Sequence, residues 1–497
     1  MNRFRLHPYY LRQEELHIPE FRCKKAETAE LLEYAYYEAL NVMFNVCCVC
    51  DYDAGGKPVF VAGGEYNNAW TRDGSYNNLA AGSLLSPGVA KNTFSLLVAP
   101  DEGMVNGGVW GLRFTDMQFW DKVIWIIAAH HHSLINQDRD FLAESAAVAV
   151  KTIAYQEAHY YRNEFGLFRG PGFFLDSIGA WPKDYCKERI KQTGNSCVLD
   201  YPELLQNMTL STNCLYVESY RCAAKMLDAL NRDAALAAQY REKADTLAEN
   251  IRQRFFAPSE TGIPAYFIDG MGKENNGKPV FFQEGCGIGF ALLFGIPNKE
   301  QAQAVFDHIH HEPNGLPCIW PNLWNDYVGN GQLGSTHGGY HTPCNIVIHP
   351  QVNGIWILGC AEYGQTELIQ SEIENLFRLV KENQGVYENY HARTGNPKLT
   401  GLQAKKHQNW SATACLSAIH HAVFGLRCCE TGLSFSPNLP PEWGEMTLSG
   451  IHFRDMDLDL ILRGGGNKIS RFLLDGKTHA PRLAEDVAGH HEITIEL

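Results

Sequence analysis

The sequence predicts a mainly helical protein, in which helical hairpins are arranged in a ring, followed by a small C-terminal β-module. Apolar residues recur at helical spacing over residues 25–425. The connecting segments alternate between short turns rich in Asn, Asp and Gly and long segments rich in Gly, Pro and Trp, which favours hairpins with their long loops on one face. After residue 431, short apolar or alternating segments bounded by Gly and Pro replace the helical pattern.

We therefore expect a helical domain at residues 1–430 and a β-strand module at residues 431–497. Strands are expected at residues 433–437, 446–449, 458–462 and 491–497. Helices are expected at residues 25–45, 74–85, 115–136, 138–162, 211–230, 233–255, 283–294, 299–310, 350–363, 365–383 and 409–424.

Composition narrows the class of protein. The chain has 497 residues, of which 45% are apolar, so it can bury a large core. Its net charge of −14 argues against nucleic acid as a partner and suits a neutral substrate. No apolar window reaches about eighteen residues, and the N-terminus has no hydrophobic stretch after its basic start, so we expect neither a membrane span nor a signal peptide. Several of the 15 cysteines lie in apolar runs, which indicates buried thiols and a cytoplasmic location.

The most informative segment is residues 386–397, where Glu388 stands between Tyr387 and Tyr390 in a loop flanked by glycines. An expected helix beginning with Asn-Trp410-Ser follows about twenty residues later. Aromatic rings cover the apolar faces of a pyranose, and a carboxylate can activate water or donate a proton. This combination favours carbohydrate chemistry at Glu388 over a solvent-exposed loop glutamate.

These segments resemble the signature of glycoside hydrolase family 63 and its relatives. The resemblance covers residues 315–425, including residues 315–327 (GLPCIWPNLWNDY) and 349–356 (HPQVNGIW). It implies an (α/α)6 barrel and an inverting glycosidase that acts on an α-linked, glucoside-like substrate. It also implies that Glu388 is the general base, which deprotonates a water molecule on the side opposite the leaving group.

The sequence departs from the family pattern in two places. Residues 340–343 read Tyr-His-Thr-Pro where the family usually has Trp-Arg-Gly-Pro, and His349 stands where the family usually has Trp. We expect these departures to change the substrate more than the reaction.

The general acid is expected on another loop, far upstream of Glu388. Asp176 lies in residues 166–182, a segment rich in Gly, Pro and aromatic residues. Such surroundings desolvate a carboxyl group and raise its pKa, as a general acid requires. The family resemblance also implies an Asp at about this stage of the barrel. The alternative is a helix N-cap at Asp176, with Asp184 as a weaker candidate acid.

A third group of polar residues occurs at residues 68–76 (NAWTRDGSY). Arg72 and Asp73 can bind two sugar hydroxyls through charge-assisted hydrogen bonds, and Trp70 can stack on the ring. The segment resembles a loop that many (α/α)6 glycosidases place at the bottom of the −1 sugar pocket. The alternative is a buried ion pair with a helix cap.

Further aromatic residues are candidates for lining the sugar site: Trp110, Trp320 and Trp324, together with Tyr387, Tyr390 and Trp410. Glu284 opens an expected helix and is either a first-turn charge or a pocket group.

We expect no metal and no cofactor. The His-rich segments 130–132, 308–311 and 420–421 lack the spacing of a zinc-binding helix, and no Cys-x-x-Cys pair recurs at zinc spacing. There is no Walker loop and no dinucleotide fingerprint.

The sequence thus favours a cytoplasmic glycoside hydrolase acting on a small carbohydrate, with Asp176 and Glu388 as acid and base. In an inverting enzyme the two carboxyl groups lie about 6.5–9.5 Å apart, against about 5 Å in a retaining one. Two alternatives remain. A sugar epimerase or isomerase would use histidine acid–base pairs that converge on the pocket, with Glu388 outside it. A non-catalytic glycan-binding protein would keep Trp70 and Arg72 without the two carboxylates.

Overall fold

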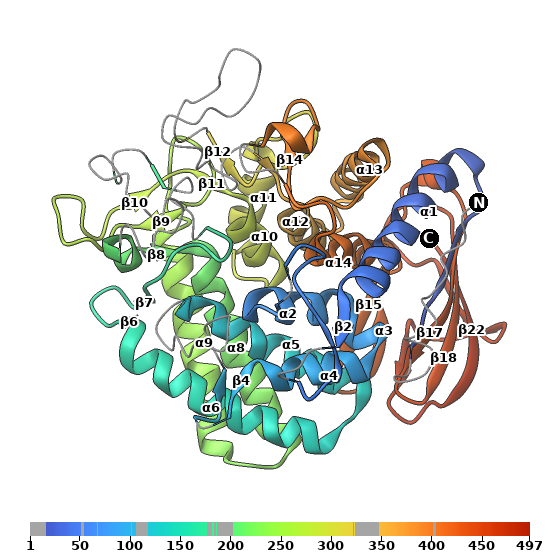
Figure 1. Ribbon diagram of the computed structural model, residues 1–497, viewed down its shortest axis with the longest axis horizontal. Helices are drawn as coiled ribbons and strands as arrows, with labels where there is room; N and C mark the ends of the chain where they lie inside the picture. The colour runs from blue at the N-terminus through green and yellow to red at the C-terminus, as the bar shows by residue number, and fades with distance from the viewer. Residues whose placement is uncertain are drawn as a thin grey trace.

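The structure, a computed structural model, describes residues 16–50, 54–66, 68–100, 102–105, 118–175, 181–182, 185, 202–321, 323, 347–400 and 404–497. Helices make up the greater part of these residues, and a β-sheet region packs against one side of them (Figure 1). The mainly helical class and the C-terminal β-strands predicted from the sequence are confirmed.

Six of the described helices form a closed inner ring, in which each helix contacts the next and the last contacts the first. Their residues are mostly buried, as expected for helices that are surrounded by protein on all sides. In ring order they are α2 (Thr71–Asn77), α5 (Lys122–Asn136), α8 (Leu210–Ala229), α10 (Gly285–Leu293), α12 (Pro350–Glu362) and α14 (Asn409–Ser417).

Each inner helix follows an outer helix in the sequence. Most outer helices bury one face and expose a charged one, and α13 shows this most clearly, because its buried apolar positions recur at helical spacing between Ile369 and Val380. These outer–inner pairs are the hairpins of an (α/α)6 barrel. The described outer helices are α1 (Ala26–Asn41), α4 (Pro87–Leu96), α6 (Arg139–Tyr160), α9 (Ala234–Arg254), α11 (Lys299–His308) and α13 (Thr366–Asn383).

The length of a loop depends on whether it leads from an inner helix to an outer one or from an outer helix to an inner one. An inner helix passes to the next outer helix through a short segment, such as residues 137–138 between α5 and α6. An outer helix passes to its inner partner through a longer segment, such as residues 309–349 between α11 and α12. The long connections therefore meet at the N-terminal ends of the inner helices, which is where a binding site is expected.

Two predicted helices on either side of α4 differ in their bounds. The helix predicted at residues 74–85 begins at Thr71 and continues through a π-helical segment, Asn78–Gly82, into α3 (Ser83–Leu85). The helix predicted to start at residue 115 is α5, which starts at Lys122, because Gln118 has a φ of 50° that an α-helix does not allow.

Two further differences concern helix starts. The helix predicted from residue 283 begins at Gly285, because Gln283–Glu284 (β11) pairs antiparallel with Ile319–Trp320 (β12). Helix α4 was not predicted, since its Ser-Pro-Gly start resembles a turn. Pro is nevertheless well tolerated at the first helical position, which Pro87 occupies.

The β-module is completed by a strand from the other end of the chain. Its largest sheet has the order β1-β17-β18-β22-β19-β20. The N-terminal strand β1 (Glu20–Cys23) pairs antiparallel with β17, so residues 431–497 do not form this sheet alone. The other strands named here are β17 (Met446–Phe453), β18 (Met456–Arg463), β22 (Gly489–Glu496), β19 (Arg471–Leu474), β20 (Lys477–Thr478), β15 (Leu426–Cys429) and β16 (Gly432–Phe435).

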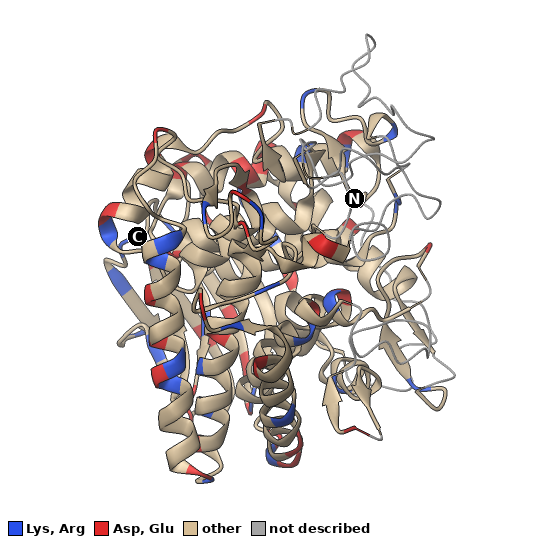
Figure 2. Cartoon of the chain, turned by 90° about the vertical axis from the view of Figure 1, so that its left-hand side faces the viewer, with Lys and Arg blue, Asp and Glu red and all other residues tan. Residues whose placement is uncertain are grey.

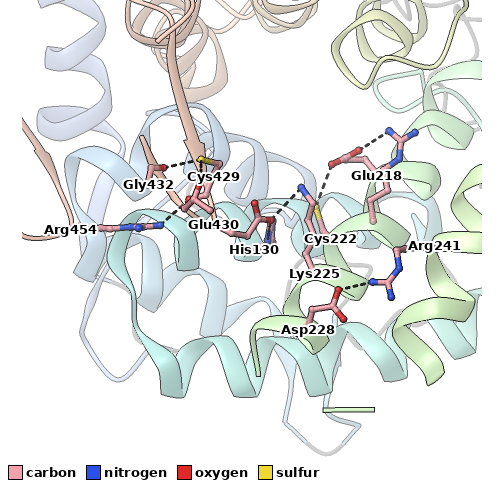
Figure 3. A network of polar contacts seen from close by, with 12 residues as sticks. His130, Glu218, Cys222, Lys225, Asp228, Arg241, Cys429, Glu430, Gly432 and Arg454 are labelled. Carbon is pink, nitrogen blue, oxygen red and sulfur yellow. Dashed lines mark hydrogen bonds and ion pairs between the residues drawn. The ribbon is translucent and has the colours of Figure 1, made fainter. Parts of the chain in front are cut away.

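The turn between β15 and β16 joins the β-module to two inner helices (Figure 3). Glu430 Oε1 lies 3.6 Å from His130 Nε2 on α5 and 3.4 Å from Lys225 Nζ on α8. Burial, reinforced by the Lys225 charge, lowers the pKa of His130 to about 4. His130 is therefore neutral at pH 7, and the charged pair of this junction is Glu430 with Lys225.

Acidic and basic residues are interspersed along the helices in Figure 2. None of the described helices is both long and apolar enough to cross a membrane.

Candidate active site

The first turn of α2 carries two charged residues into the centre of the ring. Arg72 and Asp73 are 8% and 4% exposed, a degree of burial that charged groups reach only with partners. Arg72 Nη1 donates a hydrogen bond to the Phe173 carbonyl oxygen at 2.6 Å, and Arg72 Nε lies 3.7 Å from Asp121 Oδ2. The Phe174 ring covers the guanidinium group, whose carbon is 5.3 Å from the ring centroid. Arg72 is thus held in one orientation by a carbonyl, a carboxylate and a ring.

The loop between α13 and α14 places Glu388 through backbone hydrogen bonds. Glu388 N donates to the Lys405 carbonyl oxygen at 2.8 Å, and Gln408 N donates to the Val386 carbonyl oxygen at 3.0 Å. The carboxylate of Glu388 accepts a hydrogen bond from the Tyr66 hydroxyl, which lies 3.3 Å from Oε2. Two loops far apart in the sequence therefore meet at one carboxyl group.

The electrostatic environment links Glu388 to the first turn of α2. Burial raises the pKa of Glu388, although the backbone of Lys405, the Tyr66 hydroxyl and the positive charges of Lys405 and Arg72 act in the opposite direction. Burial also raises the pKa of Tyr66, as do the nearby charges of Glu388 and Asp73. Arg72, Asp73, Tyr66 and Glu388 therefore interact within one site.

Three aromatic rings pack beside Arg72. The Phe174 centroid lies 5.4 Å from that of Trp410 and 6.0 Å from that of His349, and the His349 and Trp410 centroids are 5.1 Å apart. Trp410 Nε1 and His349 Nδ1 are buried and have no hydrogen-bond partner among the described residues. Rings with unused polar atoms suit a pyranose, whose faces are apolar and whose rim carries hydroxyls.

Burial, followed by the positive charge of Arg72, lowers the pKa of His349 to about 3. The ring is therefore neutral at pH 7, with one donor and one acceptor nitrogen. It can bind a hydroxyl group, and it is poorly suited to exchange protons near neutral pH.

The other sequence candidates take different places. Tyr390 is fully buried, donates to the Gly385 carbonyl oxygen at 2.9 Å and accepts from Tyr387 N at 3.0 Å, so it holds the loop of Glu388. Tyr387 is half-buried and packs edge-on against Tyr390. Trp70 is half-buried at the N-cap position of α2. Trp320 is half-buried and stacks on His310 with a centroid distance of 3.8 Å.

Three candidates, Asp176, Trp110 and Trp324, lie outside the described residues, as does the weaker candidate Asp184. The predicted acid and its distance from Glu388 therefore remain predictions. The described segment that leads to Asp176, residues 171–175, packs against Arg72 through Phe173 and Phe174.

Sequence reasoning missed Tyr66 and Phe174 and did not choose Glu284. Tyr66 has no motif of its own, because its role depends on a loop more than three hundred residues away. Phe174 stands in the aromatic segment that pointed to Asp176, and its neighbourhood was the available signal. Glu284 is 1% exposed and is described further below.

Among the described residues, no group of three or more His, Cys, Asp or Glu side chains could hold a metal ion. Several buried histidines instead bond to neighbouring elements. His420 Nε2 lies 2.9 Å from the Tyr36 hydroxyl, and His132 Nδ1 lies 3.1 Å from Ser83 Oγ.

Comparison with known proteins assigns the fold. A family model described as glycosyl hydrolase family 65, C-terminal domain, matches residues 426–477, from the first residue of β15 to the first residue of β20. None of the curated proteins compared with the chain matches it.

Solved structures are similar over most of the chain. A sialidase superposes with a TM-score of 0.66 at 14% identity, over 94% of this chain and 41% of that one. The family GH78 rhamnosidase of Bacillus sp. GL1 superposes with a TM-score of 0.59 at 13% identity, over 97% of this chain and 44% of that one. The GH63 mannosylglycerate hydrolase from Thermus thermophilus, in complex with Tris and D-glycerate, superposes with a TM-score of 0.55 at 14% identity, over 78% of this chain and 99% of that one. This chain spans less than half the length of the first two and nearly all of the third. It has the fold of the six-hairpin glycosidases.

Proposed function

We propose that this chain is a glycoside hydrolase of the six-hairpin superfamily that acts by inversion on an α-linked, glucoside-like substrate. Glu388 removes a proton from water as the water attacks the anomeric carbon, and Asp176 gives a proton to the departing glycosidic oxygen. Arg72 and Asp73 hold hydroxyls of the −1 sugar, while Trp410 and Phe174 cover it.

The observation that carries the proposal is the environment of Glu388. A general base works best when its pKa approaches the working pH, and burial raises the pKa of this carboxyl group. The hydrogen bond from Tyr66 and the positive charge of Arg72 limit that rise, because both favour the ionised form that a general base requires.

The histidine-based alternative has less support. His349 packs in the site beside Arg72, but the low pKa of its ring keeps it from titrating near pH 7. Glu388 interacts with the same arginine, whereas an epimerase with histidine pairs was expected to leave Glu388 outside the pocket.

The substrate is best sought with a panel. We suggest α- and β-linked disaccharides and aryl glycosides, with mannosylglycerate included because the similar family GH63 structure carries that name. Wild type should cleave a member of the panel, and Glu388→Gln and Asp176→Asn should each lose at least about a hundredfold in kcat, as expected for acid–base groups.

Glu382→Gln is the matched control. Glu382 lies shortly before the loop of Glu388, is exposed, and pairs with Arg378 on the surface. This variant should keep wild-type activity. Full activity in Glu388→Gln would exclude the proposed base and favour the histidine-based alternative.

A further inference from the structure

A buried carboxyl group lies close to the candidate site without touching it. Glu284, the N-cap residue of α10, is 1% exposed. A β-carbon added at Gly172 would lie 2.8 Å from Glu284 Oε1, and one added at Gly287 would collide with Oε2. Glycines from two separate segments therefore leave the space that this carboxyl group occupies.

The carboxyl group holds one residue, Ser211, in the first turn of α8. Ser211 Oγ donates a short hydrogen bond to Glu284 Oε1, and Ser211 N lies 3.2 Å from Oε2. A serine hydroxyl has a single proton, so donating it to Glu284 turns the lone pairs of Oγ away from that bond. These lone pairs can then accept a hydrogen bond from Phe173 N, which lies 2.9 Å from Ser211 Oγ.

The hydrogen bonds that run from Glu284 through Ser211 to Phe173 continue to Arg72. The Phe173 backbone is fixed on its N–H side by Ser211 and on its carbonyl side by Arg72 Nη1, at 2.6 Å. The adjacent Phe174 ring lies over the same guanidinium group. A displacement of Ser211 would therefore move both the carbonyl and the ring that orient Arg72.

We propose that Glu284 is a positioning residue, which acts through Ser211 and the Phe173 backbone to hold Arg72 in its substrate-binding orientation. The proposal rests on the proposed function only in taking Arg72 as a substrate ligand. The mechanical link from Glu284 to Arg72 stands on the contacts alone.

The protonation state of Glu284 affects this link. Among the described residues, the titratable groups that face it are the thiols of Cys214 on α8 and Cys286 on α10, and burial raises the pKa of both, so they are uncharged. The segment 171–175 contributes no titratable side chain. Burial, opposed only by the hydrogen bonds from Ser211, raises the pKa of Glu284 to about 8. The carboxyl group is thus neutral at pH 7, and its ionisation near pH 8 creates a buried charge with no cationic partner among the described residues.

The link can be tested without any sugar, by NMR of the full chain labelled with 15N-arginine. The Arg72 side-chain signal is assigned by its loss in Arg72→Lys. Ser211→Ala should shift this signal and make its N–H exchange with water about tenfold faster, which corresponds to one typical hydrogen bond. Ser219→Ala is the control, because Ser219 is buried on the same helix and bonds to the Tyr216 carbonyl oxygen. It should leave the signal unchanged.

If Ser211→Ala does not fold, Ser211→Cys serves the same comparison, since a thiol is a weaker donor and acceptor of similar size. An Arg72 signal that is identical in wild type and the Ser211 variant would overturn the proposal.

Glu284→Gln tests the origin of the effect. The Arg72 signal of wild type should shift with a midpoint near pH 8, the pKa of Glu284. In Glu284→Gln, which is neutral and of the same shape, the signal should match wild type at pH 7 and lack the shift. A shift of equal size in both proteins would overturn the role of Glu284. Because no step requires hydrolysis, an enzyme that cleaves none of the sugars would refute the proposed function and leave this result standing.

Discussion

The Tyr66 hydroxyl lies 3.3 Å from Glu388 Oε2, which joins the loop before α2 to the loop before α14. This contact connects the loops that precede the first and the last helix of the inner ring, at the end where the long connections meet. It also brings the carboxyl group near Arg72 and Asp73, since the charges of these residues act on Glu388 and Tyr66 respectively.

Replacing this tyrosine should change the pH dependence of the reaction. The Tyr66 hydrogen bond favours the ionised form of Glu388, so Tyr66→Phe should raise the pKa of the base further. Because the base must be ionised, the acidic limb of the kcat/KM profile should move to higher pH. The exposed Tyr34 provides the control variant, Tyr34→Phe, which should keep the wild-type profile. A limb that stays in place or moves to lower pH in Tyr66→Phe would contradict this role.

Trp410 should contribute to binding more than to stability. Its Nε1 has no partner among the described residues, so Trp410→Phe removes no hydrogen bond within the part of the chain that the structure describes. We expect a rise in KM of about tenfold, the factor for one hydrogen bond, and little change in melting temperature. In contrast, Trp125 Nε1 donates to the Phe94 carbonyl oxygen at 3.2 Å. Trp125→Phe should therefore lower the melting temperature and leave KM unchanged, and the reverse pattern would refute this assignment.

Glu284 should make the fold sensitive to pH. The unfolded chain ionises this group near its ordinary value of 4.5, whereas the folded chain holds the proton up to about 8. The unfolded state therefore binds fewer protons between these values, and stability falls as the pH rises through this window. Melting temperatures measured from pH 5 to pH 8 should decline more steeply in wild type than in Glu284→Gln. Parallel declines would show that Glu284 ionises normally in the fold.

The link from Ser211 to Arg72 also predicts non-additive kinetics. Ser211→Ala should lower kcat/KM in the wild-type background, because it loosens the Phe173 carbonyl that orients Arg72. In an Arg72→Lys background the same change should have little further effect, since the planar fork that it positions is already lost. Losses that simply add in the double variant would indicate that Ser211 acts on stability alone.

The sequence indicated the barrel because its signals are local. Helical spacing and the alternation of short and long loops were enough to predict the hairpins, and Glu388, Arg72 and Asp73 stood in recognisable motifs. The N-terminal strand β1 was missed, because four residues pair with a strand more than four hundred positions away and carry no local sign of it. Tyr66 and Glu284 were not selected for the same reason, since each depends on neighbours that only the closed ring supplies.

The structure places the aromatic candidates in different surroundings. Trp410 packs against Phe174 beside Arg72, whereas Tyr390 is enclosed and bonds to its own loop. An aromatic residue beside a carboxylate can cover a sugar or support the loop, and sequence spacing does not distinguish the two. The Nε1 of Trp410 has no partner among the described residues, whereas the hydroxyl of Tyr390 bonds within its own loop, and this contrast is the reason for proposing Trp410 as the residue that covers the sugar.

The most direct test of the central claim is the configuration of the sugar at the moment of release. Proton NMR of the first product formed from a cleaved α-glycoside should show the β-anomer, with mutarotation to the α-anomer following, and Glu388→Gln should release neither. This result would establish inversion with Glu388 as base. Initial release of the α-anomer, or β-anomer release that persists in Glu388→Gln, would contradict the account.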